Sequence, residues 1–156
     1  MDSAKRESGR RVLVLNGPNL NLLGRREPDQ YGHTTLNEIE DELRSYAASR
    51  VAEIRFVQSN HEGELIDVIH KAIGWADAMI VNAAGLTHSS VGLRDAIIAA
   101  AIPTVEVHLS NIYRREEFRH HSLIADVVAG QITGFGAFSY RLGMEAALYL
   151  LDKKGS

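Results

Sequence analysis

Short apolar runs alternate along the chain with longer segments in which apolar residues recur at helical spacing. The first run, at 12–15, reads Val-Leu-Val-Leu and is apolar at every position, which is typical of a strand buried on both faces. The run at 78–81 is again apolar throughout, and further strands are predicted at 54–57, 104–108 and 127–132.

The segments between the strands predict four helices. Residues 35–38 read Thr-Leu-Asn-Glu, a capping box in which the Thr and Glu side chains pair with free backbone amides at a helix start. The helix that follows places Leu36, Ile39 and Leu43 on one face. Further helices are predicted at about 62–73, 90–101 and 138–151, and one short helix within the polar segment 109–122.

Strict alternation of strands and helices predicts an α/β fold. Strands joined through helices run parallel, and the helices cover both faces of the sheet, giving three layers. Five such units suit a flavodoxin-like sheet of strand order 2-1-3-4-5. The length of 156 residues fits one domain. We therefore predict a flexible tail at 1–10 and a single catalytic domain at 11–156.

Composition narrows the classes of function. The formal net charge of −3 does not favour a nucleic-acid partner, and no apolar run reaches the length of about 18 residues that a membrane span needs. The absence of cysteine excludes disulfides and thiolate chemistry. The charged start has no apolar stretch of the kind that marks a secretory signal, so we expect a cytoplasmic protein.

Ligands of open parallel sheets bind outside the carboxyl ends of the strands, and polar residues gather at these ends here. The loop after the first strand, 16–31, is roughly three times the usual length of about 2–6 residues. It contains Arg25, Arg26 and Tyr31, with glycines near its two ends, and is interpreted as a lid that closes over an anion. The alternative is a solvated insertion.

Tyr31 is a candidate general base. A tyrosine has an ordinary pKa of about 10, so a phenolate at neutral pH needs about 4 kcal/mol of stabilisation. Arg26, on the same loop, can supply it. A loop tyrosine can equally serve as a packing anchor.

Two other strand ends offer candidate groups. Glu106 and His108 lie two apart and so share one face of a strand, where the carboxylate can orient the imidazole as a general acid. Asn82 and His88 bracket a turn with small residues that suits a carboxylate ligand, although Asn82 can simply cap the strand end. In the loop after the predicted strand at 104–108, Arg115 and Arg119 are one helical turn apart and could face one ligand. Surface pairing with Glu116 or Glu117 is their alternative role.

Several familiar motifs are absent or incomplete. Residues 134–136, Gly-Phe-Gly, lack the third glycine of a dinucleotide fingerprint and follow the last strand. The sequence contains no phosphate-binding GxxxxGK[ST] loop, no GxSxG elbow and no HExxH zinc motif. These absences disfavour P-loop enzymes, serine hydrolases and zinc hydrolases.

Taken together, these residues resemble the type II 3-dehydroquinate dehydratases, and the likeness covers about residues 11–152. Its longest motif is LNGPNLNLLGRREP at 15–28, and NAAGLTHSSV at 82–91 is comparably specific. The remaining motifs lie at 31–32, 58–63, 93–96, 106–111 and 114–119.

The resemblance implies a cofactor-free anti elimination of water from 3-dehydroquinate through an enolate, giving 3-dehydroshikimate in the shikimate pathway or in quinate catabolism. It implies no metal site. The implied catalytic residues are Tyr31 as base beside Arg26, Asn19 acting through a water on the enolate, and His108 as acid supported by Glu106. The implied substrate-binding residues are Asn82 with the backbone amides of Leu109 and Ser110 for the carboxylate, His88 and Arg119 for ring hydroxyls, Arg115 beside the lid, and Asp95 reaching the site of an adjacent subunit, in trimers that assemble into a dodecamer.

Two other classes of function are weighed against the enzyme. A flavodoxin-like signalling or binding module would need acidic residues at the ends of the first and third strands, where this sequence has Asn16 and Asn82. The second alternative is an assembly protein with a degenerate site.

Overall fold

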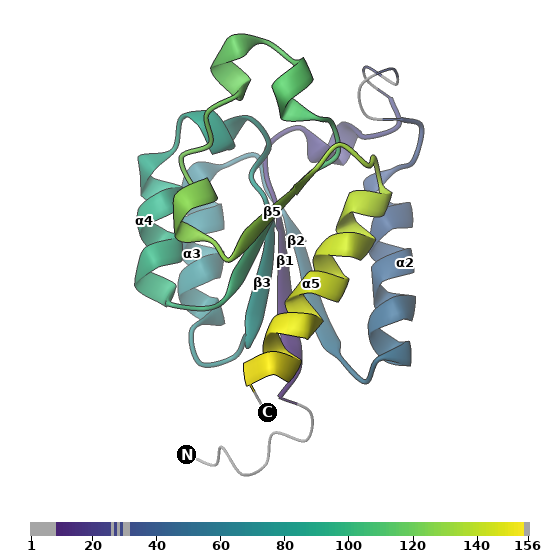
Figure 1. The fold of residues 1–156 in the computed structure, drawn as a ribbon, viewed down its shortest axis with the longest axis vertical. Helices are drawn as coiled ribbons and strands as arrows, with labels where there is room; N and C mark the ends of the chain where they lie inside the picture. The colour runs from purple at the N-terminus through teal and green to yellow at the C-terminus, as the bar shows by residue number, and fades with distance from the viewer. Residues whose placement is uncertain (1–8, 26, 28, 30–31, 155–156) are drawn as a thin grey trace.

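A parallel five-stranded sheet forms the centre of the molecule. The computed structural model describes residues 9–25, 27, 29 and 32–154. The strand order is β2-β1-β3-β4-β5, so the predicted flavodoxin-like α/β fold is confirmed (Figure 1). The strands are β1 (Arg11–Asn16), β2 (Glu53–Gln58), β3 (Ala78–Asn82), β4 (Thr104–His108) and β5 (Gly130–Thr133).

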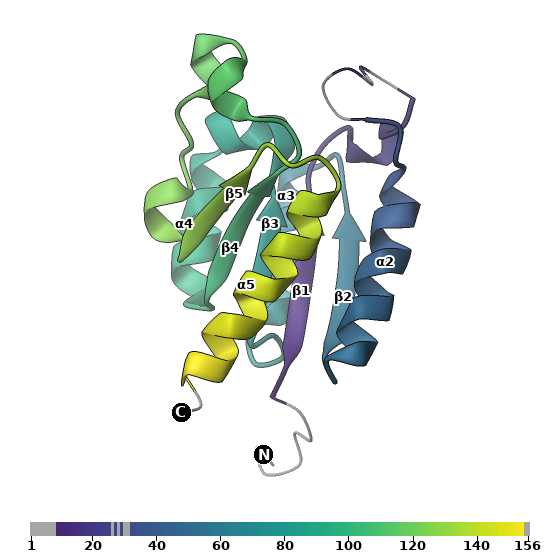
Figure 2. The same cartoon turned by 45° about the vertical axis from the view of Figure 1, so that its right-hand side comes forward.

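Helices cover both faces of the sheet, as predicted. On one face lie α2 (Leu36–Ser49) and α5 (Phe138–Lys154), and on the other lie α3 (Glu62–Ala72) and α4 (Val91–Ala100) (Figures 1 and 2). The capping box also forms, because the Thr35 hydroxyl accepts a hydrogen bond from the Glu38 amide.

The alternation of side chains along each strand separates two hydrophobic cores. In β1, Val12 and Val14 pack on the α2 and α5 side, whereas Leu13 and Leu15 pack on the α3 and α4 side. The same parity governs β3 and β4. It therefore decides which side each polar residue at a strand end faces.

Two predicted segments differ in the structure. Residues 127–129 precede β5 rather than belong to it: Val127 closes a 3-10 turn by donating to the Ile124 carbonyl over 3.0 Å, and pairing with β4 begins only where Ala129 donates to Thr104. Apolar runs do not distinguish a strand from such a turn. The segment 109–122 holds two 3-10 helices instead of one short helix, at Ile112–Arg114 (η4) and Glu117–Arg119 (η5).

The first part of the long loop packs against the core. Leu20 and Leu23 are buried around a 3-10 turn at Leu20–Leu22 (η2), so the chain as far as Leu23 is anchored to the hydrophobic core on the α2 and α5 side. Of the predicted lid residues, Arg25 is exposed, whereas Arg26 and Tyr31 lie outside the described residues.

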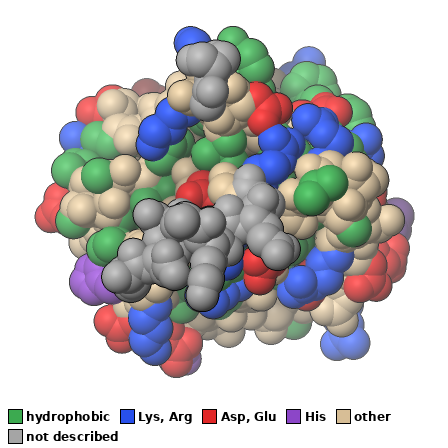
Figure 3. Space-filling view, turned by 90° about the horizontal axis from the view of Figure 1, so that it is seen from below, with side chains coloured by type: hydrophobic (Ala, Val, Ile, Leu, Met, Phe, Trp, Pro, Cys, Tyr) green, Lys and Arg blue, Asp and Glu red, His purple; other side chains and the backbone are tan. Residues whose placement is uncertain are grey.

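The opposite end of the sheet, where the strands begin, is seen in Figure 3. Acidic and basic side chains are intermixed around its rim.

Within the part of the chain that the structure describes, no helix is both long enough and apolar enough to cross a bilayer.

Gly17 holds the ends of β1 and β3 together. Its amide donates to the Asn82 carbonyl over 2.8 Å, and a Cβ at this position would lie 2.4 Å from the Ala83 carbonyl oxygen. We predict that Gly17→Ala lowers the free energy of unfolding by about 1–3 kcal/mol, measured by urea denaturation, because backbone must shift to admit the methyl group. Gly63→Ala is the control, since Gly63 lies in α3 with open space around it. Equal stability of the two variants would contradict the steric argument.

Candidate active site

A pocket opens at the carboxyl ends of β1, β3 and β4, where the sequence predicts the ligand site. Its floor is formed by the strand ends and its wall by the 3-10 segments that follow β3 and β4. Eight predicted site residues line it, namely Asn19, Asn82, His88, His108, Leu109, Ser110, Arg115 and Arg119. The other lining residues are Pro18, Leu20, Leu23, Ala84, Gly85 and Ile112.

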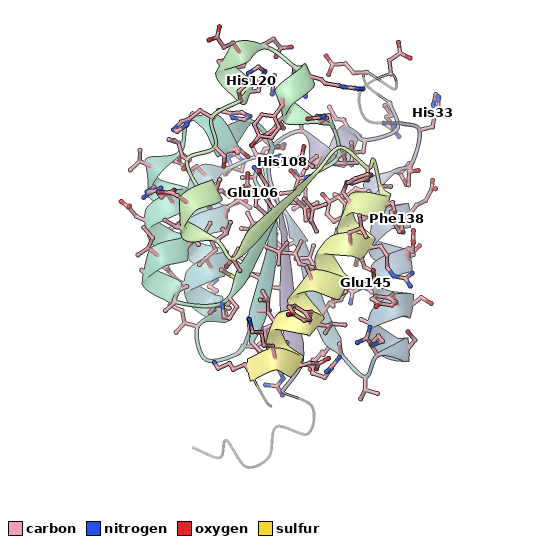
Figure 4. The ribbon with its side chains drawn as sticks, in the orientation of Figure 1. His33, Glu106, His108, His120, Phe138 and Glu145 are labelled. Atoms are coloured by element: carbon pink, nitrogen blue, oxygen red, sulfur yellow. The ribbon has the colours of Figure 1, made fainter. Side chains whose placement is uncertain are left out.

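Glu106 and His108 form the hydrogen-bonded pair that the sequence predicts. The Nε2 atom of His108 lies 2.5 Å from the Oε2 atom of Glu106, and both side chains are buried at the end of β4. Figure 4 shows the pair below the segment that carries His120. Only His108 of the two lines the pocket, so Glu106 acts from behind it.

Two side chains that the sequence analysis did not single out hold the Glu106 carboxylate. The Ser122 hydroxyl donates to its Oε2 atom over 2.8 Å and the Gln131 amide over 3.1 Å. Burial raises the pKa of Glu106, but the hydrogen bonds from His108, Ser122 and Gln131 outweigh it, and the pKa is lowered overall. Glu106 is therefore an ionised acceptor for the imidazole at neutral pH.

The lowered pKa of Glu106 predicts how stability depends on pH. Since the folded-state pKa lies below the unfolded one, the carboxylate stabilises the fold above the unfolded pKa, and this contribution is lost as the pH falls through the folded-state pKa. Melting temperatures of the natural protein and of Glu106→Gln should therefore differ most near neutral pH. The difference should shrink below pH ~4, near the ordinary carboxyl pKa. A difference that is constant between pH 7 and pH 3 would contradict the assignment.

The Asn82 side chain, at the end of β3, and the backbone amides that follow β4 are hydrogen-bond donors at the same pocket. The Asn82 amide is buried, with its Oδ1 atom accepting from the Ala84 amide and its Nδ2 atom donating to the Tyr140 hydroxyl over 2.8 Å. Asn82 thus caps the strand end and also lines the pocket. Among the described residues, the backbone amides of Leu109 and Ser110 have no acceptor. These donors can bind a carboxylate.

Asn19 is held at the end of β1 in a left-handed backbone conformation. Its φ is 70°, and its amide donates to the Asn60 Oδ1 atom over 2.9 Å. Gln58 donates to the same Asn60 oxygen and also to the Gly17 carbonyl. The Asn19 side chain is thereby presented to the pocket from a fixed backbone.

His88 and Arg119 also line the pocket. Burial lowers the pKa of His88, against the effect of the His121 carbonyl that lies 3.0 Å from its Nδ1 atom. His88 is thus neutral at neutral pH and has its other ring nitrogen available for a hydroxyl. Arg119 pairs with Glu116 over 2.5 Å, so the surface pair considered from the sequence also forms.

Among the described residues, two of the predicted site residues, Glu106 and Asp95, do not line this pocket. Asp95 is exposed on α4 and does not line it. Arg26 and Tyr31 lie outside the described residues. Among the described residues, no group of three His, Asp or Glu side chains could hold a metal ion.

Comparison with known proteins settles the family. The family model "Dehydroquinase class II" matches residues 10–148. The chain belongs to the class II dehydroquinases. A 3-dehydroquinate dehydratase of Gloeobacter violaceus is 62% identical over 92% of this chain and 90% of its own length, and one of Acaryochloris marina is 59% identical over 90% and 95%. The crystal structure of type II dehydroquinase from Butyrivibrio crossotus superposes with a TM-score of 0.86 at 39% identity, over 92% of this chain and 97% of that one.

The resemblance stated from the sequence is thus confirmed, and the pocket is the candidate active site of a class II dehydroquinase. The sequence analysis missed three side chains behind the pocket, Ser122, Gln131 and Tyr140, and assigned no role to Asn60. Asn60 carried a signal, because it follows the second strand in a polar cluster. The other three come from distant segments, and no pattern linked them to the strand ends.

Proposed function

We propose that this class II dehydroquinase performs its reaction, the removal of water from 3-dehydroquinate to give 3-dehydroshikimate, in the pocket at the strand ends. Membership of the family makes the chain a hydro-lyase. The observation that supports the site best is the buried Glu106–His108 pair, because His108 lines the same pocket as Asn82, Leu109 and Ser110.

The substrate carboxylate binds to Asn82 and to the amides of Leu109 and Ser110 in this proposal. One Nδ2 hydrogen of Asn82 has no acceptor among the described residues, and the two backbone amides are likewise unused. Three convergent donors at one end of the pocket fix the orientation of the ring.

His108 is proposed as the general acid. Glu106 holds its Nε2 atom, so Nδ1 is the nitrogen that remains for the substrate. The ionised carboxylate orients the imidazole, whose protonated form gives its proton to the departing hydroxyl. The oxygen leaves as water.

Tyr31 is proposed as the base. Its phenolate, stabilised by Arg26, removes the proton beside the ketone and leaves an enolate. Asn19, through a bound water, stabilises the enolate charge, and its fixed backbone supports this role because a preorganised donor needs no rearrangement when the charge develops. Loss of the hydroxyl on the opposite side completes an anti elimination.

The remaining predicted roles concern specificity and assembly. We propose that His88 and Arg119 bind ring hydroxyls and that Arg115 supplies a second positive charge beside the lid. The exposed position of Asp95 on α4 supports a role across a subunit boundary, in trimers assembled into a dodecamer. Light scattering on the purified protein tests the assembly. Residues 11–156 as one catalytic domain, a cytoplasmic location and a reaction without cofactor are further parts of the proposal.

The activity is tested with purified protein and 3-dehydroquinate in the presence of EDTA, following the absorbance of the conjugated enone carboxylate. We expect rapid product formation. Folded protein that yields no product at any pH between 6 and 9 would overturn the proposal and would favour an assembly protein. The signalling module is already disfavoured, because Asn16 and Asn82 end β1 and β3 where it needs acids.

A further inference from the structure

Three buried side chains form a line of hydrogen bonds behind the pocket. The Tyr140 hydroxyl, from α5, lies 2.7 Å from the Asn16 Oδ1 atom and 2.8 Å from the Asn82 Nδ2 atom. All three residues are at most 2% exposed. Tyr140 does not line the pocket, whereas Asn82 does. The hydroxyl therefore contacts the pocket only through the Asn82 amide.

The direction of each hydrogen bond in this line is determined by fixed backbone groups. Asn16 donates from Nδ2 to the Val57 carbonyl over 3.0 Å, so its Oδ1 atom faces Tyr140 and must accept. The Tyr140 hydroxyl donates its only hydrogen to Asn16 Oδ1, so toward Asn82 it can only accept. Asn82 must therefore turn its amide nitrogen toward Tyr140.

The other end of Asn82 agrees with this orientation. The Ala84 amide can only donate, and it lies 3.2 Å from Asn82 Oδ1. With one Nδ2 hydrogen on Tyr140 and the oxygen accepting from Ala84, the donor that Asn82 has left for the pocket is its second N–H. A flipped amide would instead present an oxygen, which repels a carboxylate.

The fold explains why a residue of α5 reaches this point. Asn16 and Asn82 are paired in register and have the parity of strand positions that face α5. One turn after Tyr140, Gly143 lets the helix lie close to the sheet, because a Cβ there would be 2.7 Å from Val107 Cγ2. The close approach places the Tyr140 hydroxyl between the two asparagines.

We infer that Tyr140 is a positioning residue that selects for a carboxylate-bearing substrate by fixing the Asn82 amide with its N–H toward the pocket. This inference rests on the proposed role of Asn82 in carboxylate binding. Tyr140 touches neither substrate nor reacting atoms. It acts on binding of the carboxylate and leaves the proton transfers to other groups.

The hydroxyl is also a constant donor. Burial raises the pKa of Tyr140, and the hydrogen bond from Asn82 opposes this effect only in part. The hydroxyl is thus protonated throughout the working range of pH. Its loss should leave the pH profile of kcat unchanged.

The first test is Tyr140→Phe, which keeps the ring and removes the hydroxyl. We expect KM for 3-dehydroquinate to rise about 5- to 30-fold, the range that follows from weakening one hydrogen bond to a charged group, while kcat changes less than about 2-fold. Tyr149→Phe is the matched control, because Tyr149 lies on the same helix and is 63% exposed. A folded Tyr140→Phe variant with the KM of the natural protein would overturn the inference.

A double-mutant cycle with Asn82→Ala separates this inference from the proposed function. If Tyr140 acts through Asn82, Tyr140→Phe should change KM less than about 2-fold in the Asn82→Ala background. An equal effect in both backgrounds would overturn the inference while leaving Asn82 as a carboxylate ligand. An Asn82→Ala enzyme with normal KM would overturn both that role and the inference, although the dehydratase activity itself would stand.

Asn16→Ala provides an independent variant should Tyr140→Phe fail to fold. It removes the acceptor of the Tyr140 hydroxyl, whose hydrogen can then point toward Asn82 and compete with the Ala84 amide for the Asn82 oxygen. We expect KM to rise with little change in kcat and in its pH profile. An unchanged KM in folded Asn16→Ala would contradict the inference.

Discussion

Tyr31→Phe should fold and bind 3-dehydroquinate but turn it over about 10²–10⁴-fold more slowly. The expected loss is that of a general base whose replacement cannot accept a proton. The substitution removes only the hydroxyl and retains the aromatic ring. The measurement is kcat by the enone absorbance, with binding of 3-dehydroquinate followed by calorimetry on the slow variant.

Two features of this experiment distinguish a base from a packing anchor, the alternative role considered from the sequence. Loss of an anchor would weaken binding and lower the melting temperature, whereas loss of a base lowers kcat and leaves both nearly unchanged. Tyr149→Phe, on exposed helix surface, controls for removal of a tyrosine hydroxyl in general. Near-normal turnover by Tyr31→Phe would refute the assigned base without refuting the dehydratase.

His108→Gln should lower kcat by a similar factor, about 10²–10⁴, because the leaving hydroxyl would depart without a proton. Glutamine is chosen because its amide can still donate to the buried Glu106 carboxylate, which would otherwise lose its closest partner. The fold should therefore survive, and the effect should be confined to kcat. Steady-state kinetics at several pH values and thermal melting provide the measurement.

His70→Gln is the matched control for this variant, since His70 is exposed on α3, away from the pocket. It should have normal kinetics. If His108→Gln lost less than about 3-fold in kcat, another group would have to protonate the leaving hydroxyl. Arg119 and His88 line the same pocket and would be the next candidates.

Local pattern predicted most of the fold because each element repeats one simple rule. The continuous apolar runs of β1 and β3 are buried on both faces, as parallel strands covered by helices must be. The two incorrect element predictions fall in segments where neither an apolar run nor a helical spacing identifies the element. Val127 belongs to a 3-10 turn before β5, and the loop after β4 folds into two such turns.

The site was predictable to the extent that it follows from strand ends. Residues such as Asn19, Asn82 and His108 come directly after or at the end of strands, and parallel strands bring these positions to one edge. Pairing of Glu106 with His108 follows from strand parity alone. Distances along the chain do not matter for such residues, because the sheet sets their spacing.

The supporting groups were not predictable in this way. Ser122 and Gln131 meet Glu106 from a loop and a strand that follow it by 16 and 25 residues, and Tyr140 reaches Asn16 across 124 residues. Nothing in a one-dimensional pattern says which distant hydroxyl satisfies a buried carboxylate or amide. Burial makes such a partner necessary, and only packing chooses it.

The sequence by itself thus determined the fold class, the edge of the sheet at which the site lies, and the family, because strand parity and motif spacing are local properties. The tertiary structure decided how the site is held: which groups hold Glu106, which way the Asn82 amide turns, and how closely α5 approaches the sheet. These depend on contacts between segments far apart in the chain, where a buried polar group accepts whichever partner the packing brings within reach.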